Sequence, residues 1–263
     1  MMTLVLKPGY SFDSDASTYI DAVETADGQA LETGVRIAIN DFVLGCKQDG
    51  IWTAIKASCI LAGARTTNGA LVPLVGTAPT PNNFDLVGDT DYDRKTGLVG
   101  DGSTKYLNTN RPNNGDPQDS KHISFYKSVA PTTTNTKYMG AQDTGIPSLT
   151  YLIDNAADLT FGVNRSGGTG SGYTNAQLGF VGTSRSASNL TSFRAASLTT
   201  TDANPSNANN TLDIFVYGRN LNGSANSLTD ARLSFYSIGE SLDLAALDTR
   251  VSNLMTAIGA AIP

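Results

Sequence analysis

The sequence predicts a mainly β protein, a sandwich of two antiparallel sheets with a helical segment before it and a helix at its end. Four apolar runs that contain aromatic residues occupy the second half of the chain, and long stretches of Gly, Ser, Thr and Asn separate them. Short apolar segments between turn-forming residues are typical of strands in all-β folds. The four runs are HISFYKSV (122–129), LTFGVN (159–164), LDIFVYGRN (212–220) and ARLSFYSIGE (231–240).

The first 57 residues are interpreted as an N-terminal arm and helical lead. Residues 1–12 form a short apolar segment that could add a strand or serve as a docking arm. From residue 30, apolar side chains recur at intervals of three and four, which predicts an amphipathic helix ending near Gly50. Its apolar stripe could pack on the sandwich, on another copy of the chain or on a different protein. The stripe consists of Leu31, Val35, Ile39, Phe42, Val43 and Cys46, and a short helical turn, IWTAIK (51–56), is predicted after it.

Residues 58–263 are interpreted as the sandwich with its closing helix. Short runs such as CILAG, ALVPLVG and FDLVG, broken by Gly, Pro and Asn, indicate strands and turns. The polar spans 108–121, 165–176 and 199–211 are predicted to be loops, which sandwiches collect at their edges, where binding usually occurs. Residues 241–262 contain an apolar stripe, which predicts a closing helix with Ser241 or Asp243 as its N-cap. The stripe consists of Leu244, Leu247, Val251, Leu254 or Met255, and Ile258.

Composition excludes some classes of function. Charged residues make up 16% of the chain and the net charge is -6, so we expect no nucleic-acid binding, which requires clustered Lys and Arg. No window approaches the roughly eighteen uninterrupted apolar residues of a membrane span, and the start MMTLVLKPGYSF lacks the pattern of a secretion signal. We therefore expect no membrane insertion. If the protein leaves a cell, we expect it to do so by lysis or through a dedicated export machine, and this favours a viral particle over a secreted lectin.

The two cysteines carry little information about function. Cys46 falls on the helical stripe and Cys59 lies inside the apolar run CILAGA. This placement favours two buried thiols, with a disulfide as the alternative.

Residues suited to catalysis are scarce, and we expect no enzymatic activity. His122 is the only histidine, and Glu24, Glu32 and Glu240 are the only glutamates. A Ser-His-Asp site would have to use His122, which heads a predicted strand with no G-x-S-x-G elbow nearby. Two separated cysteines and one histidine cannot supply the usual four ligands of zinc.

One acidic cluster, GDTDYDRKTG, contains Asp89, Asp91 and Asp93. In a strand the three carboxylates would share one face, as in sandwich glycosidases, but their position between glycines is more typical of a turn. The spacing does not fit a calcium loop of the EF-hand type, because Arg94 replaces the turn glycine and Gly100 the bidentate glutamate. A looser calcium site is one candidate, and a solvated acidic loop is the alternative; no other cofactor is expected.

Several aromatic and amide side chains are candidates for sugar contacts, because sugars stack on aromatic rings and bond to amides. Asparagines are also common in turns for conformational reasons, which is the alternative interpretation. The Gly-rich stretch RSGGTGSGYTN lacks the lysine of a phosphate-binding loop. The candidates are Tyr138, Tyr173, Asn175, Asn220 and Asn222.

Three blocks resemble laminin G-like and pentraxin-like domains of the concanavalin A-like jelly-roll type. TGLVGDGSTKYLNTNR (96–111) is similar to the family's opening, and HISFYKSVAPT (122–132) to its next core strand, with Tyr126 where many members carry Trp. Residues 217–254 resemble the family's last strand and closing helix. The resemblance covers about residues 65–258 and implies a jelly-roll sandwich. Many members bind calcium at the sandwich edge, but no motif here carries those ligands over.

Two further segments, residues 30–64 and 232–258, resemble virion proteins of tailed bacteriophages, including tail-fibre and head-fibre proteins. This resemblance implies a structural protein located in the virion, made in the host cytoplasm and released by lysis. We expect a surface-exposed fibre or receptor-binding module that contacts host glycans. The alternatives are a capsid decoration or cement protein that grips other virion subunits without glycan binding, and a glycan-degrading enzyme that would depend on the acidic cluster. The resemblance also implies a homo-oligomer, with a trimer favoured.

Overall fold

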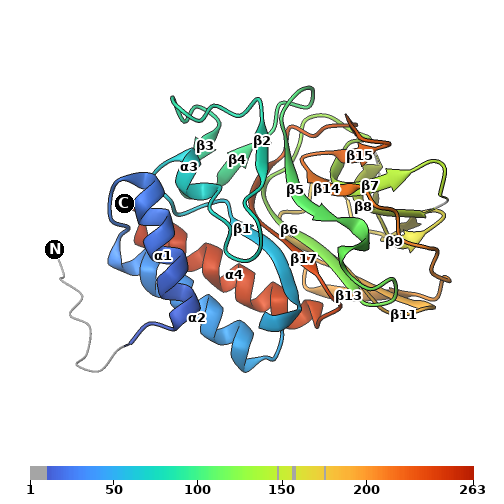
Figure 1. Ribbon diagram of the computed structural model, residues 1–263, viewed down its shortest axis with the longest axis horizontal. Coiled ribbons are helices and arrows are strands. Elements are labelled where there is room, and N and C mark those ends of the chain that lie inside the picture. The colour runs from blue at the N-terminus through green and yellow to red at the C-terminus, as the bar shows by residue number, and fades with distance from the viewer. Residues whose placement is uncertain (1–10, 147, 156–157, 175) are drawn as a thin grey trace.

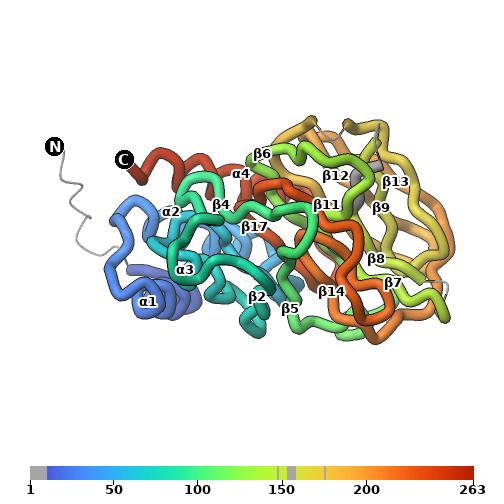
Figure 2. The backbone as a smooth tube through the Cα atoms, turned by 90° about the horizontal axis from the view of Figure 1, so that it is seen from above, coloured from blue at the N-terminus to red at the C-terminus, as the bar shows by residue number. Residues whose placement is uncertain are grey.

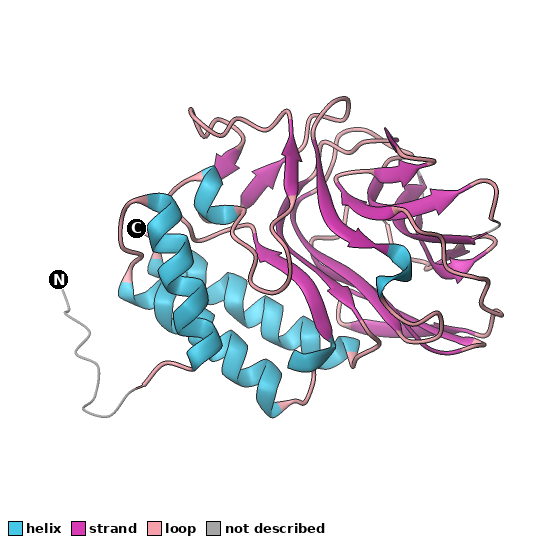
Figure 3. Cartoon of the chain, viewed as in Figure 1, coloured by secondary structure: helices cyan, strands magenta, loops and turns pink. Residues whose placement is uncertain are grey.

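The computed structural model describes residues 11–146, 148–155, 158–174 and 176–263. Two antiparallel sheets form a sandwich, and a layer of helices covers the outer face of one of them (Figure 1, Figure 3). The views along two perpendicular directions agree that the helices α1 and α2 lie at one end of the long axis and that β8, β9 and β13 lie at the other (Figure 2). The predicted mainly β sandwich with helices before and after it is confirmed.

The first sheet contains eight described strands in the order β13-β12-β11-β6-β17-β4-β3, with β1 paired to β17 beside β4. The bounds are β1 (Ile55–Ile60), β3 (Tyr92–Asp93), β4 (Gly97–Val99), β6 (Lys121–Val129), β11 (Gly179–Ala187), β12 (Leu190–Ala195), β13 (Leu198–Asp202) and β17 (Arg232–Gly239). The first and last parts of the chain therefore pair within one sheet, which joins the helical lead to the sandwich.

The second sheet contains nine described strands in the order β10-β9-β8-β7-β14-β5-β2, with the β15-β16 hairpin attached to β7 through β15. The bounds are β2 (Thr80–Asn82), β5 (Tyr106–Pro112), β7 (Lys137–Asp143), β8 (Ser148–Asn155), β9 (Asp158–Arg165), β10 (Thr169–Gly170), β14 (Asp213–Val216), β15 (Arg219–Leu221) and β16 (Ser224–Asn226). All pairs are antiparallel except β15 with β7.

The core between the sheets is built from alternate residues of their strands. Ile123 and Phe125 of β6 point into it, and the ring of Phe125 stacks on Tyr138 of the opposite sheet with centroids 4.6 Å apart. A bulge in β17 between Leu233 and Phe235 shifts the alternation. Leu233 and Tyr236 consequently both face this core, while Phe235 faces the helices.

Three cationic side chains are also buried in the sandwich. Lys121 donates to both oxygens of Asn113, and the ammonium group of Lys127 lies 3.2 Å from the hydroxyl of Tyr138. Arg185 of β11 donates from Nε to the carbonyl of Val163 at 2.8 Å. All three are fully buried, and burial lowers the pKa of Lys121 to about 8.

The helical layer has its own apolar core. It consists of α1 (Ser14–Asp27), α2 (Thr33–Gln48) and α4 (Leu244–Ala261), and shorter helical turns occur at η1 (Trp52–Ala54), α3 (Thr67–Ala70) and η2 (Asn113–Gly115). The rings of Phe42 on α2 and Phe235 on β17 meet edge to face, 5.7 Å apart. Of the three alternatives for the apolar stripe of α2, packing on its own sandwich is therefore what the structure shows.

Several details of the sequence prediction are confirmed. The helix predicted from residue 30 to near Gly50 is α2, and the C-terminal helix is α4 with Asp243 as its N-cap. The carboxylate of Asp243 accepts from the backbone N–H of Ala245 at 2.8 Å, whereas the hydroxyl of Ser241 contacts Ser120. Both cysteines are free and buried, so the alternative of a disulfide is wrong.

Other details are corrected. The helix α1 was not expected from the sequence, and only residues 52–54 of the predicted helical turn are helical, because residue 55 already begins β1. Each of the three predicted loops also contains regular structure: residues 108–112 belong to β5, residues 169–170 to β10 and residues 199–202 to β13. The β13 segment lacks an apolar pattern because it is largely exposed, whereas the β5 segment is mostly half-buried and places only Thr109 in the interior. In the part of the chain that the structure describes, no helix has the length and apolarity to span a membrane.

Candidate functional site

The single histidine is part of the core. Nε2 of His122 lies 2.5 Å from Oγ of Ser237, and Nδ1 lies 2.6 Å from the carbonyl oxygen of Glu240. Burial lowers the pKa of His122 to about 4, so the ring is neutral near pH 7. With its Nδ1 proton directed to a carbonyl, the ring accepts from the Ser237 hydroxyl. Both side chains are fully buried, and neither is accessible to a substrate in this conformation.

The three carboxylates of the acidic cluster accept hydrogen bonds from separate turns of the backbone. Asp89 accepts from the backbone N–H of Thr67 at 2.7 Å, and Asp93 accepts from that of Thr96 at 2.8 Å. Asp91 is buried, bonded to the N–H of Asp85 at 2.8 Å and ion-paired to Lys105 at 2.5 Å. Within the described ranges, no group of three or more His, Cys, Asp or Glu side chains is placed to hold a metal ion. The arrangement does not fit a calcium site.

The four candidate sugar-contact residues that the structure describes do not form one exposed site. The prediction that Tyr138 contacts a sugar is corrected. Tyr138 lies in β7 with no exposed surface, because its ring fills the core between the sheets. Asn220 is also buried and fixes a turn, accepting from the N–H of Gly223 at 2.8 Å. Asn222 is exposed and accepts from the N–H of Thr144 at 2.9 Å. Tyr173 is half-buried and packs near Phe193, with centroids 5.9 Å apart, and Asn175 lies outside the described residues.

A polar hollow of about 420 Å³ opens where three loops meet, beside the β15-β16 hairpin. We call it the loop-end hollow. Its walls come from the segment between β4 and β5, the segment between β6 and β7, and the end of β16 with the residues after it. None of the lining residues is charged, and seven of the ten carry a hydroxyl or amide. The lining is Gly102, Ser103, Thr133, Thr134, Asn135, Thr136, Ala225, Asn226, Ser227 and Leu228.

Two aspartates outside the lining hold these loops in shape. Asp101 accepts from the backbone N–H groups of Ser103 and Thr104 at 2.9 and 2.8 Å. Asp230 accepts from the N–H and hydroxyl of Thr133 at 3.2 and 2.7 Å. Burial acts to raise the pKa of Asp230, but hydrogen bonds from Thr132 and Thr133 outweigh it and lower the pKa overall. The carboxylate is therefore charged near pH 7 and is hydrogen-bonded to the loop that contains Thr132 and Thr133.

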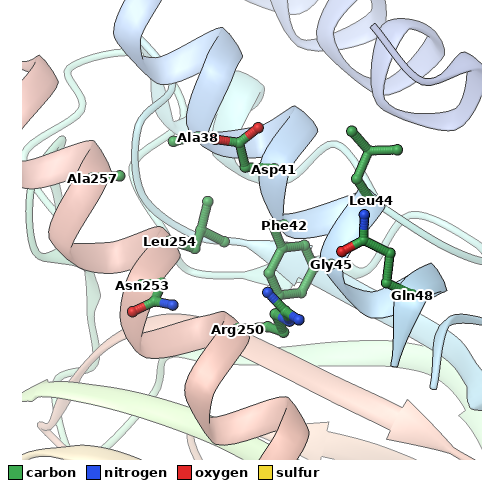
Figure 4. Close-up of a pocket in the computed structure, with 10 residues that line it drawn as sticks. All are labelled: Ala38, Asp41, Phe42, Leu44, Gly45, Gln48, Arg250, Asn253, Leu254 and Ala257. Carbon is green, nitrogen blue, oxygen red and sulfur yellow. The ribbon is translucent and has the colours of Figure 1, made fainter. Parts of the chain in front are cut away.

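A second hollow, the helical groove, separates α2 from α4 and has a volume of about 410 Å³ (Figure 4). Phe42 and Leu254 form its apolar floor, and polar side chains such as Asp41 and Asn253 stand at its rim. Arg250 crosses one end to form a two-pronged ion pair with Asp49, at 2.7 and 2.9 Å. Arg250 packs directly against Gly45, where an added Cβ would lie 2.7 Å from the Arg250 side chain.

Sequence reasoning missed most of the loop-end hollow. Its residues lie in three segments that are at least thirty positions apart, and each segment by itself looks like an ordinary polar loop. The one available signal was the uncharged polar character shared by APTTTNT (130–136) and NGSANS (222–227). Asn222, one of the candidates, lies in the hairpin that borders this hollow.

Comparisons with known proteins give no family assignment. No family model and no curated protein matches the chain. Among solved structures, the binding domain of botulinum neurotoxin serotype D is similar at 12% identity and a TM-score of 0.49, over 76% of this chain and 50% of that one. Domain 4 of an extracellular arabinanase from Geobacillus stearothermophilus is similar at 14% identity and a TM-score of 0.43, over 67% of this chain and 82% of that one.

Domains LG4-5 of the mouse laminin α1 chain are similar at 15% identity and a TM-score of 0.36, over 48% of this chain and 37% of that one. The chain thus spans half or less of the length of the neurotoxin and laminin chains. None of these likenesses identifies a ligand for this protein.

Proposed function

We propose that this chain is a non-enzymatic structural protein of a bacteriophage virion, exposed at the particle surface as a fibre or receptor-binding module that contacts host glycans. The observation that carries the glycan contact is the loop-end hollow, whose lining of hydroxyls and amides matches the hydrogen-bonding groups of sugars. The virion assignment rests on the sequence resemblance of residues 30–64 and 232–258 to phage structural proteins.

The proposal that the protein is not an enzyme is supported by the positions of the two sets of residues that are chemically best suited to catalysis. His122 is enclosed in the core, and the carboxylates of Asp89, Asp91 and Asp93 are bonded to separate backbone turns. A hydrolase would need such groups to converge beside a substrate.

Attachment to the particle would use the helical end of the molecule. The apolar stripe of α2 is covered by the sandwich, so a neighbouring subunit would contact the opposite side of the helical layer, which includes the helical groove. The loop-end hollow has no helical residue in its lining and would remain open. Assembly as a homotrimer is part of the proposal and is tested by light scattering of the purified protein.

A second candidate function is a capsid decoration or cement protein. The observation that favours it is the outer strand β13, which is exposed and carries Leu198 with 60% of its surface accessible. An unprotected edge strand offers backbone groups to a neighbouring chain. In this case the protein would stabilise the particle without binding glycans.

Antibody labelling of intact particles, viewed by electron microscopy, tests the two candidates. Label confined to the tail or fibre tips is the expected result. Label spread over the head would favour decoration, and particles that carry no label would contradict both.

A further inference from the structure

We infer that the loop-end hollow is a binding pocket for neutral saccharides, and that it discriminates against acidic ones. The inference rests on the proposed glycan contact and narrows it to one site and one class of ligand. The first argument is chemical: hydroxyls and amides both donate and accept, which suits the hydroxyls of a sugar. Leu228 and Ala225 add an apolar area against which the C–H groups of a sugar ring can pack.

The second argument is a buried polar atom that lacks a partner. Thr136 lines the hollow and is 5% exposed, yet its hydroxyl has no hydrogen-bond partner among the described residues. Leaving such a group unpaired is unfavourable, so these positions normally meet a protein group, a water molecule or a ligand. A saccharide hydroxyl in the hollow, reached directly or through one water, would supply the partner.

The third argument is electrostatic and concerns the class of ligand. The lining supplies no Lys or Arg, which is the usual partner of a carboxylate or phosphate on an acidic sugar. Asp101 and Asp230 lie directly behind the walls and are bonded to them. One cation is also bonded to the lining, because Arg219 donates from Nε to Asn226 at 3.1 Å. The two carboxylates outnumber it and disfavour an anionic sugar, and the net charge of -6 adds to this effect.

The fourth argument is that the walls are fixed before any ligand binds. Asp101 holds the backbone of residues 103–105 and Asp230 holds that of residues 132–133, so the two loops have little freedom left. A ligand therefore meets a preformed surface, and less conformational entropy is lost on binding.

The test uses the full-length chain and a panel of neutral oligosaccharides together with uronic-acid and sialic-acid oligosaccharides, measured by biolayer interferometry. The key variant is Thr136→Val, which keeps the shape of the side chain and removes only the hydroxyl. Its matched control is Thr191→Val in β12, because the hydroxyl of Thr191 is also buried without a partner but lies outside the hollow.

We expect binding to neutral members of the panel, a loss of about threefold to tenfold in affinity in Thr136→Val, as for one hydrogen bond, and no change in Thr191→Val. Both threonine variants should unfold no more easily than the parent chain, since neither removes a hydrogen bond within the protein.

Preference for acidic oligosaccharides, or neutral binding that is equal in Thr136→Val and the parent chain, overturns the inference and leaves the proposed glycan contact standing. Binding to no member of the panel overturns both. The two failures are therefore distinguished by the same experiment.

Discussion

Arg94 and Glu32 form a two-pronged ion pair, with Nη1 to Oε1 at 3.0 Å and Nη2 to Oε2 at 2.6 Å. Glu32 lies directly before α2, and Arg94 lies in the turn between β3 and β4, so the pair fastens the helical layer to the first sheet. Arg65 joins from the segment after β1, 2.9 Å from the same carboxylate. Hydrogen bonds between such charged groups are among the strongest in proteins when they are partly buried.

Replacing this carboxylate should destabilise the protein. We expect Glu32→Gln to lower the free energy of unfolding by about 2 kcal/mol, because two guanidinium groups lose a charged acceptor. The control is Glu240→Gln, which breaks the more exposed pair with Lys56 and should cost about 0.5 kcal/mol or less. Urea unfolding followed by circular dichroism measures both, and equal losses would contradict the special role of Glu32.

The pKa of His122 leads to a prediction about pH. Burial places it at about 4, below its value of about 6.5 in the unfolded chain. The unfolded chain therefore binds a proton between pH 6.5 and 4 that the folded chain does not, and stability falls as pH decreases through this window, by up to about 3 kcal/mol.

A proton NMR titration checks the origin of this effect without an assignment problem, because the chain has one histidine. Its ring signal should stay constant from pH 8 to pH 5 in the folded protein. A midpoint near pH 6.5 would show that the ring is accessible and would contradict the packing against Ser237.

Two helical glycines should respond in opposite directions to the same substitution. A Cβ at Gly34 in α2 would lie 2.7 Å from the Cβ of Ala261 in α4, so Gly34→Ala should destabilise by about 1 kcal/mol or more. A Cβ at Gly259 meets no atom within 4 Å, and Gly259→Ala should stabilise by about 0.5 to 1 kcal/mol through helix propensity. Thermal unfolding of both variants tests how closely the two helices approach.

The thiols should be unreactive in the folded protein. Burial raises the pKa of both Cys46 and Cys59 to about 12, which removes the reactive thiolate at neutral pH. A colorimetric thiol reagent should detect almost no thiol in the native protein and two per chain in 6 M guanidinium. Rapid native labelling would indicate that the helical layer or the sandwich opens readily.

The sequence allowed the sandwich, α2 and α4 to be predicted because each shows its own periodicity. The helix α1 was missed because its buried face has only four residues, Ala16, Tyr19, Ile20 and Val23, among many polar ones. Strands such as β13 were missed because an exposed edge needs no apolar pattern. In each case the packing against a distant segment, rather than local preference, determines the structure.

The candidate site was less predictable than the fold. Tyr138 was a candidate for sugar contacts, but pairing of β7 with β14 and β8 places its ring in the core. The loop-end hollow forms only when the segments around Ser103, Thr134 and Asn226 meet, and nothing local in the sequence marks that meeting. Sequence patterns thus identified the kind of surface, polar and uncharged, but not its location.

The buried cations of β6 bear on how this strand finds its neighbours. Lys121 and Lys127 occupy the same face of the strand as Ile123 and Phe125, while His122, Ser124 and Tyr126 occupy the other. A slip of one residue would turn every side chain to the opposite face, so both ammonium groups would lose the carbonyl and phenol that bind them. A misaligned strand would therefore leave two buried ammonium groups without partners, and we expect this cost to favour the native register over the slipped one.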